Sequence, residues 1–178
     1  DKKIPDVISE FVAAVRFRDI PAGAVEHAKK LIADQIANGI SGYRTNKSQY
    51  ENDLMTDFLY SSGQSAVWGA GRKAAVTGAA FLNAVNAHAN EFDDVHRETR
   101  VHVGSVIVPM ALAMAEHRRS GGEELITAIV AGLEISIRFG LALSRGASAR
   151  FWHPSGVCGV FGACAASAKL LGLDRRQI

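Results

Sequence analysis

Apolar residues recur at steps of three and four along most of this 178-residue chain. This spacing lines up one face of an α-helix, because the helix has 3.6 residues per turn. The pattern predicts helices over residues 4–17, 50–60, 74–90, 104–118, 123–144 and 157–173, and one more that Pro21 opens and the Gly39–Gly42 region ends. Residues 65–69 are β-prone and precede Gly71, which indicates a hairpin. We therefore expect an all-α, multi-helix domain with at most one short β-hairpin.

Two of the predicted helices have compositions that indicate burial. Residues 123–144 carry large apolar side chains on several faces, as expected of a central helix that is buried on more than one side. Residues 157–173 are rich in glycine and alanine, which allow another helix to approach closely. Because these broad apolar faces need more cover than the chain itself offers, we expect self-association.

Composition and charge narrow the class of protein. The chain is 48% apolar with a net charge of only +2, and its basic residues are scattered rather than gathered in a stripe, so we expect no nucleic-acid partner. We find neither a basic-then-apolar leader nor an uninterrupted apolar run long enough to cross a bilayer, so we expect no membrane partner. Cys158 and Cys164 lie in an apolar run, which favours buried, reduced thiols in a cytoplasmic protein.

Residues 88–102 crowd four carboxylates and three imidazoles between two predicted helices. Carboxylates and imidazoles are the side chains that exchange protons near neutral pH, and a loop held between helices lets them converge. A further histidine, His153, stands at an abrupt helix break in Phe151-Trp-His-Pro-Ser-Gly156. The two segments together predict a proton-transfer site.

Five motifs in this order resemble the N-terminal part of the MmgE/PrpD family over essentially the whole chain. They are Ala79-Ala-Phe-Leu-Asn-Ala-Val-Asn-Ala-His88, Glu91-Phe-Asp-Asp-Val-His96, His102-Val-Gly-Ser105, Phe151-Trp-His-Pro-Ser-Gly156 and Leu170-Leu-Gly-Leu-Asp174. The family includes 2-methylcitrate dehydratase, cis-aconitate decarboxylase and iminodisuccinate epimerase. The resemblance implies a helical domain over residues 1–178 that is incomplete, with the family's α/β lid absent from this chain. It also implies an enzyme without a cofactor and a homodimer.

The resemblance also suggests roles for particular residues. In the decarboxylase branch an acidic residue, a threonine and a histidine of this loop fall on Glu91, Val95 and His102, and a second histidine falls on His153. Valine in place of threonine removes a hydroxyl that could bind a substrate carboxylate, which argues against decarboxylase specificity. The family's catalytic lysines and tyrosine lie beyond Ile178, so we expect residues 1–178 by themselves to lack turnover.

We assign His102, His153 and Asp93 to the catalytic set. Substrate binding is predicted for Glu91, Asp94, His96, Gly104 and Ser105. Two other interpretations of the acidic residues remain open: Asp93 or Asp94 caps the next turn, or it orients an imidazole. Carboxylates and imidazoles together also suit a divalent metal ion, but the resemblance implies none, so we expect no metal. Gly104-Ser105 is equally consistent with an ordinary helix start.

The predicted function is that of a lyase that moves a proton next to a carboxylate of a small di- or tricarboxylic acid. Dehydration of a 2-methylcitrate-like substrate is the first hypothesis. Epimerisation or decarboxylation within the same family is the alternative, and a non-catalytic helical dimerisation module is a hypothesis of a different class.

Overall fold

The computed structural model describes residues 3–45, 62–144 and 152–178. These residues form six α-helices, a 3-10 turn and one antiparallel hairpin: α1 (Ile4–Ala14), η1 (Phe17–Asp19), α2 (Ala22–Arg44), β1 (Ser65–Val67), β2 (Arg72–Ala74), α4 (Val76–His88), α5 (Gly104–Arg118), α6 (Gly122–Ser144) and α7 (Pro154–Leu171). The predicted all-α class with one short hairpin is therefore confirmed. The helix predicted over residues 50–60 lies outside the described residues.

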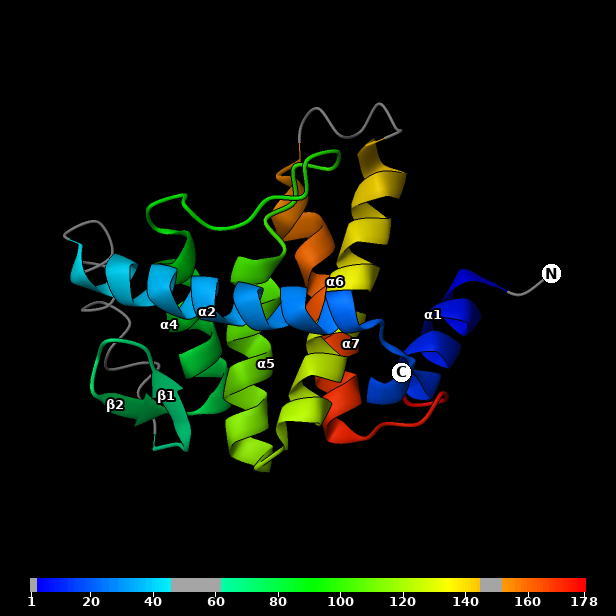
Figure 1. Ribbon diagram of the computed structural model, residues 1–178, viewed down its shortest axis with the longest axis horizontal. Coiled ribbons are helices and arrows are strands. Elements are labelled where there is room, and N and C mark those ends of the chain that lie inside the picture. Colours follow the sequence, from blue (N-terminus) through cyan, green and yellow to red (C-terminus); the bar gives the residue numbers. More distant parts are fainter. Residues whose placement is uncertain (1–2, 46–61, 145–151) are drawn as a thin grey trace.

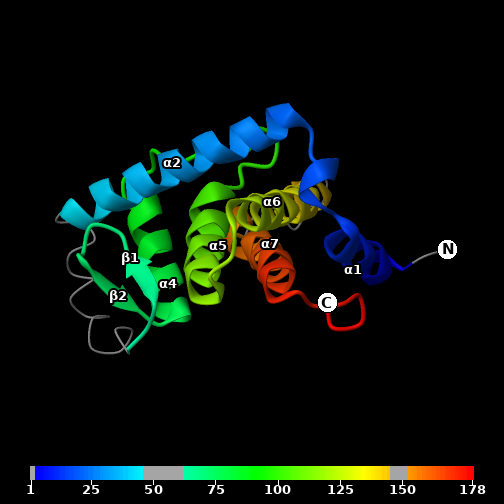
Figure 2. The ribbon, with the colours of Figure 1, turned by 60° about the horizontal axis from the view of Figure 1, so that its bottom comes forward.

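Helices α4 to α7 stand side by side, and α2 lies across α4, α5 and α6 (Figures 1 and 2). The most extensive contact is between α6 and α7. Gly132 of α6 and Gly162 of α7 face each other there, and a Cβ added at Gly132 would come within 2.8 Å of the Gly162 carbonyl oxygen. The small residues of α7 thus allow the close approach that the sequence predicts. Ile107 and Ile129 are fully buried in the core that results.

Helix α2 continues to Arg44, so the prediction that the Gly39–Gly42 region ends it is wrong. Both glycines serve helix packing. A Cβ on Gly39 would collide with the Trp68 ring, and a Cβ on Gly42 would collide with the backbone carbonyl of Asn86 in α4. Glycine can remain in a helix interior where a close contact repays its lower helix propensity.

The first helix ends at Ala14, three residues before the predicted end. The Arg16 guanidinium folds back and donates to the carbonyl oxygens of Ala13, Ala14 and Val15 at 2.6–3.2 Å. These carbonyls lack partners within the helix, so the arginine satisfies them and stabilises its end. The chain then makes the 3-10 turn η1, in which the Asp19 carboxylate accepts from the Arg16 backbone N–H.

The apolar segments differ from expectation in two respects. Gly122–Leu143 and Pro154–Leu171 are long and apolar enough to cross a bilayer by length and composition alone, although charged residues interrupt both segments. About half of each segment is buried inside the protein, which is also the pattern of core helices. Of the two cysteines predicted to be buried, only Cys158 is, whereas Cys164 is exposed.

Candidate active site

The loop between α4 and α5 lies at the end of the helices where α6 finishes and α7 begins (Figure 1). A tight turn closes this loop, with the His96 backbone N–H donating to the Val101 carbonyl at 2.9 Å and the Arg100 N–H donating to the His96 carbonyl at 2.8 Å. Arg100 has a φ of 57°, a left-handed conformation that non-glycine residues seldom adopt. The turn reverses the chain and brings His102 back toward the start of the loop.

Asp94 connects this loop to α5 and to α2. One carboxylate oxygen accepts from the Gly104 N–H at 2.9 Å and from the Gln35 side-chain amide at 3.0 Å. The first bond satisfies a free N–H at the beginning of α5, which is the role of a helix cap. A side chain on Gly104 would collide with the Asp94 carboxylate and with Gln35, so glycine is required there for this close approach.

Burial is the main cause that raises the pKa of Asp94 to about 6. The Gly104 N–H and the nearby His102 act in the opposite direction, while the charges of Asp93 and Asp34 add to the rise. Asp94 is therefore a carboxyl that gains or loses its proton just below neutral pH. Its contacts are those of a structural cap, one of the two alternatives that the sequence left open.

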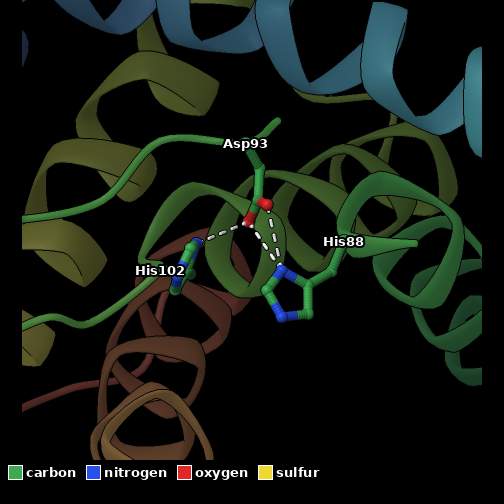
Figure 3. Close-up of side chains that lie close together, drawn as sticks. All are labelled: His88, Asp93 and His102. Carbon is green, nitrogen blue, oxygen red and sulfur yellow. Dashed lines mark hydrogen bonds and ion pairs between the residues drawn. The ribbon is translucent and has the colours of Figure 1, made fainter. Parts of the chain in front are cut away.

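Asp93 lies between two imidazoles (Figure 3). Its carboxylate oxygens are 2.9 and 3.1 Å from Nδ1 of His88 and 3.2 Å from Nδ1 of His102, and its side chain is fully buried. An ionised carboxylate can only accept hydrogen bonds, so each neutral imidazole donates Nδ1–H to it and keeps a lone pair on Nε2. The arrangement orients both rings, as a carboxylate does for the histidine of a catalytic triad.

The two imidazoles open onto a pocket of about 440 Å³. Apolar side chains form much of the pocket wall, and the residues that line it are Phe81, Ala84, Val85, His88, Ala89, His102, Ser105, Val106, His153, Ser155 and Gly156. None of these described residues is a lysine or an arginine. The pocket therefore offers imidazoles and hydroxyls as its polar side chains, and these suit proton transfer.

His153 reaches the same pocket from α7. It is the residue before the first turn of α7, where its Nδ1 accepts from the Gly156 N–H at 3.3 Å. Next to it, the Ser155 hydroxyl oxygen accepts from the His102 backbone N–H at 2.9 Å. This bond fastens the start of α7 to the loop and thus keeps His102 and His153 at one site.

The structure separates the predicted substrate-binding residues into three groups. Ser105 lines the pocket, and its hydroxyl donates to the His102 carbonyl at 3.3 Å. Gly104 and His96 hold the loop instead, the latter with its Nδ1 3.0 Å from the Thr99 hydroxyl. Glu91 is exposed, has a φ of 53° and does not line the pocket.

The cluster of His88, Asp93 and His102 could also bind a metal ion. One ligand atom each from His88, Asp93 and His102 lies within 4.8 Å of the others. A metal ion would have to replace the hydrogen bonds that now join both Nδ1 atoms to Asp93. The observed contacts thus match a hydrogen-bonded proton-transfer site directly, whereas a metal site requires their rearrangement.

Three residues of the site had no assigned role in the sequence-based prediction. His88 lies in the charged cluster, and its position three residues before Glu91 gave no sign that it pairs with Asp93. Ser155 lies inside the Phe151–Gly156 motif, so its position two residues after His153 could have indicated that it belongs to the site. Gln35 lies 59 residues before its partner Asp94, and no local pattern connects the two.

Comparisons of the sequence with known proteins identify relatives of this chain. Residues 6–178 match the model of the MmgE/PrpD N-terminal domain. The chain is 35% identical to a cis-aconitate decarboxylase-like protein of Aspergillus oryzae, with 94% of this chain and 36% of that protein covered. It is 32% identical to a cis-aconitate decarboxylase of Aspergillus terreus (87% and 33% covered), and 28% identical to one of Mus musculus (97% and 36% covered).

The chain spans about a third of the length of the curated relatives it matches. The match to the family model nevertheless covers nearly every residue of the chain, including the loop and the start of α7 that form the pocket. The chain therefore belongs to the MmgE/PrpD family and carries its N-terminal domain.

Proposed function

We propose that this protein is a lyase that acts on a small polycarboxylic acid, and that decarboxylation of a cis-aconitate-like substrate is its reaction. The observation that carries the proposal is the convergence of His88, His102 and His153 on one pocket. Two of these imidazoles are held through Nδ1, which leaves Nε2 available to take up or deliver a proton. The matched relatives that are named cis-aconitate decarboxylases support the choice of reaction.

In such a decarboxylation the C–C bond to a carboxylate breaks and CO₂ leaves. The electron pair of that bond stays with the carbon skeleton, which must take up one proton. An imidazolium beside the substrate supplies the proton and becomes a neutral imidazole. The first turns of α5 and α7 border the pocket, and the positive ends of these two helix dipoles favour the remaining carboxylates there.

Further positive charge must come from outside the described pocket wall, which contains no lysine or arginine. We propose that a lid of the kind the family resemblance implies supplies it. Closure of such a lid would exclude water and strengthen the interaction between cations and substrate carboxylates.

Decarboxylation replaces dehydration of a 2-methylcitrate-like acid as our first hypothesis. The case against decarboxylation depended on Val95, which stands where the decarboxylase branch has threonine. Val95 is 52% exposed and is not among the residues that line the pocket. Valine at this position thus removes no hydroxyl from the described pocket wall, so we no longer count it against decarboxylation.

The test is a substrate panel with the full-length protein, followed by NMR and mass spectrometry. The panel holds cis-aconitate, citrate, 2-methylcitrate and iminodisuccinate. We expect loss of CO₂ from the unsaturated tricarboxylate. Formation of an alkene from 2-methylcitrate would instead identify a dehydratase, and inversion of iminodisuccinate an epimerase.

Variants of the two histidines assigned from the sequence complete the test. We expect His102→Gln and His153→Gln each to lower kcat by roughly 10² to 10⁴, the usual contribution of a positioned acid or base, while Tm changes little. His117→Gln is the matched control, because His117 is exposed at the C-terminal end of α5. Near-normal kcat in both site variants would contradict their role as proton carriers.

We also propose that the protein forms a homodimer. Several large apolar side chains are exposed at or near the pocket end of α4 and α7, namely Phe81, Trp152, Val160 and Phe161. Exposed large apolar side chains that gather on one face are typical of interaction sites, and a dimer contact would cover them. Sedimentation velocity over a wide concentration range should show a species of twice the chain mass, and a monomer at all concentrations would exclude the dimer.

A further inference from the structure

We propose that His88 is a second catalytic imidazole, which works together with His102 on the same side of the substrate through the one carboxylate of Asp93. This inference rests on the proposed lyase function and assigns the acid and the base within it. His88 is the last residue of α4, and its side chain lines the pocket beside that of His102. Both rings are thus placed to touch a bound substrate.

The contacts of His88 are equivalent to those of His102. Each Nδ1 lies within hydrogen-bond distance of Asp93, at 2.9 Å for His88 and 3.2 Å for His102. The ring centroids are 4.7 Å apart with an interplanar angle of 65°. In Figure 3 the second nitrogen of the His88 ring lies on the side away from Asp93. A role for His102 that depends on this geometry is therefore equally available to His88.

The helix that carries His88 directs it toward the pocket. Phe81, Ala84, Val85 and His88 all line the pocket, and their spacing of three and four places them on one face of α4. The histidine thus continues the wall of the pocket and does not stand as an isolated polar residue at a helix end. A rigid helix is also a precise support for a catalytic group.

Charge balance favours one charged and one neutral ring in the His88–His102 pair. Asp93 contributes one negative charge, and the next carboxylate of the loop, Asp94, is engaged by Gly104 and Gln35. One imidazolium is compensated by Asp93, whereas two imidazolium ions in contact would repel each other. In the proposed cycle the pair therefore carries a single extra proton, so that one ring acts as the acid while the other acts as the base.

Each turnover then moves one proton in a balanced cycle. The imidazolium gives its proton to the carbon that holds the electron pair after CO₂ leaves, and both rings are then neutral. The second ring takes a proton from water through its free Nε2 and restores the single positive charge, and the hydroxide that remains combines with the released CO₂ as bicarbonate. Because both rings lie in the same part of the pocket wall, the proton arrives at one face of the substrate.

The catalytic test compares His88→Gln, His102→Gln and the double variant in the full-length protein, with His117→Gln as the control. We expect His88→Gln to lower kcat by roughly 10² to 10⁴ with little change in KM or Tm. Groups that act as one unit give non-additive losses, so the double variant should be no worse than about threefold below the poorer single variant. A kcat for His88→Gln within about threefold of the wild type, or losses that multiply, would overturn the proposal.

A spectroscopic measurement separates this proposal from the function on which it rests. Nitrogen-15 NMR of the histidine rings should show the hydrogen of neutral His88 on Nδ1, and Asp93→Asn should change this signal for His88 and His102 alike. A hydrogen on Nε2 of His88 would overturn the shared-carboxylate pair even in an active lyase. Absence of turnover on the whole panel would instead refute the lyase function, whatever the ring signals show.

Discussion

Replacing Asp94 with asparagine should make the protein more stable above pH 7 and leave its stability near pH 4 almost unchanged. The side chain is largely buried, and burial raises its pKa from 3.8 to about 6. A folded-state pKa above the unfolded value means that the folded protein favours the protonated carboxyl. The associated stability is fully present below the unfolded pKa and is lost as pH rises through the folded pKa.

The size of the effect follows from this difference in pKa. Each pH unit between the two values corresponds to about 1.4 kcal/mol, so ionising Asp94 costs about 3 kcal/mol of folding free energy. Asparagine carries no charge at any pH and keeps an oxygen that accepts from the Gly104 N–H. The free energy of unfolding of the variant minus that of the wild type should rise between pH 4 and pH 7 and then level off.

Urea denaturation at half-unit steps from pH 4 to pH 8 measures this difference directly. Taking the difference at each pH cancels the titration of the groups that do not interact with Asp94. The matched control is Glu98→Gln, which removes one carboxylate from an exposed position in the same loop, and its difference should stay nearly flat. A constant difference for Asp94→Asn, or a variant less stable than the wild type at pH 8, would refute the reasoning.

Three further predictions concern packing and accessibility. In the same denaturation assay, Gly42→Ala should lower the free energy of unfolding by at least about 1–3 kcal/mol, because its Cβ would collide with the Asn86 carbonyl. Gly23→Ala is the control, since open space surrounds Gly23, and it should raise the free energy of unfolding by at most about 1 kcal/mol. Ser155→Ala should lower the free energy of unfolding by about 1–3 kcal/mol, because it leaves the His102 N–H without its acceptor. Ser62→Ala, at an exposed position, should change the free energy of unfolding little. Equal losses in the two serine variants would contradict the hydrogen bond that joins the loop to α7. Timed alkylation with mass spectrometry should modify Cys164 well before Cys158, since Cys158 is buried and burial raises the pKa of its thiol; similar rates would contradict this burial.

The helices and their type could be predicted from the sequence, because a periodicity of three and four is a local property. The predicted ranges 104–118 and 123–144 agree with α5 and α6 to within one residue. Local patterns were weaker at helix ends and at glycines. Gly39 and Gly42 resembled a helix terminator, and only their contacts with Trp68 and Asn86 show that they serve packing within α2.

The location of the site was also predictable, since its carboxylates and imidazoles are concentrated in residues 88–102 and in the motif around His153. The sequence by itself thus determined the helices, the family resemblance and the chemical types of the site residues. The partners of each side chain were decided by the tertiary structure. Turn closure at His96 and Val101 directs His102 toward Asp93, while Gln35 and Ser155 reach the loop from 59 and 53 residues away. Such pairings depend on how helices pack in space, which no local spacing specifies. Only the folded chain therefore distinguishes Asp93, the buried carboxylate that orients two imidazoles, from Asp94, which caps a helix.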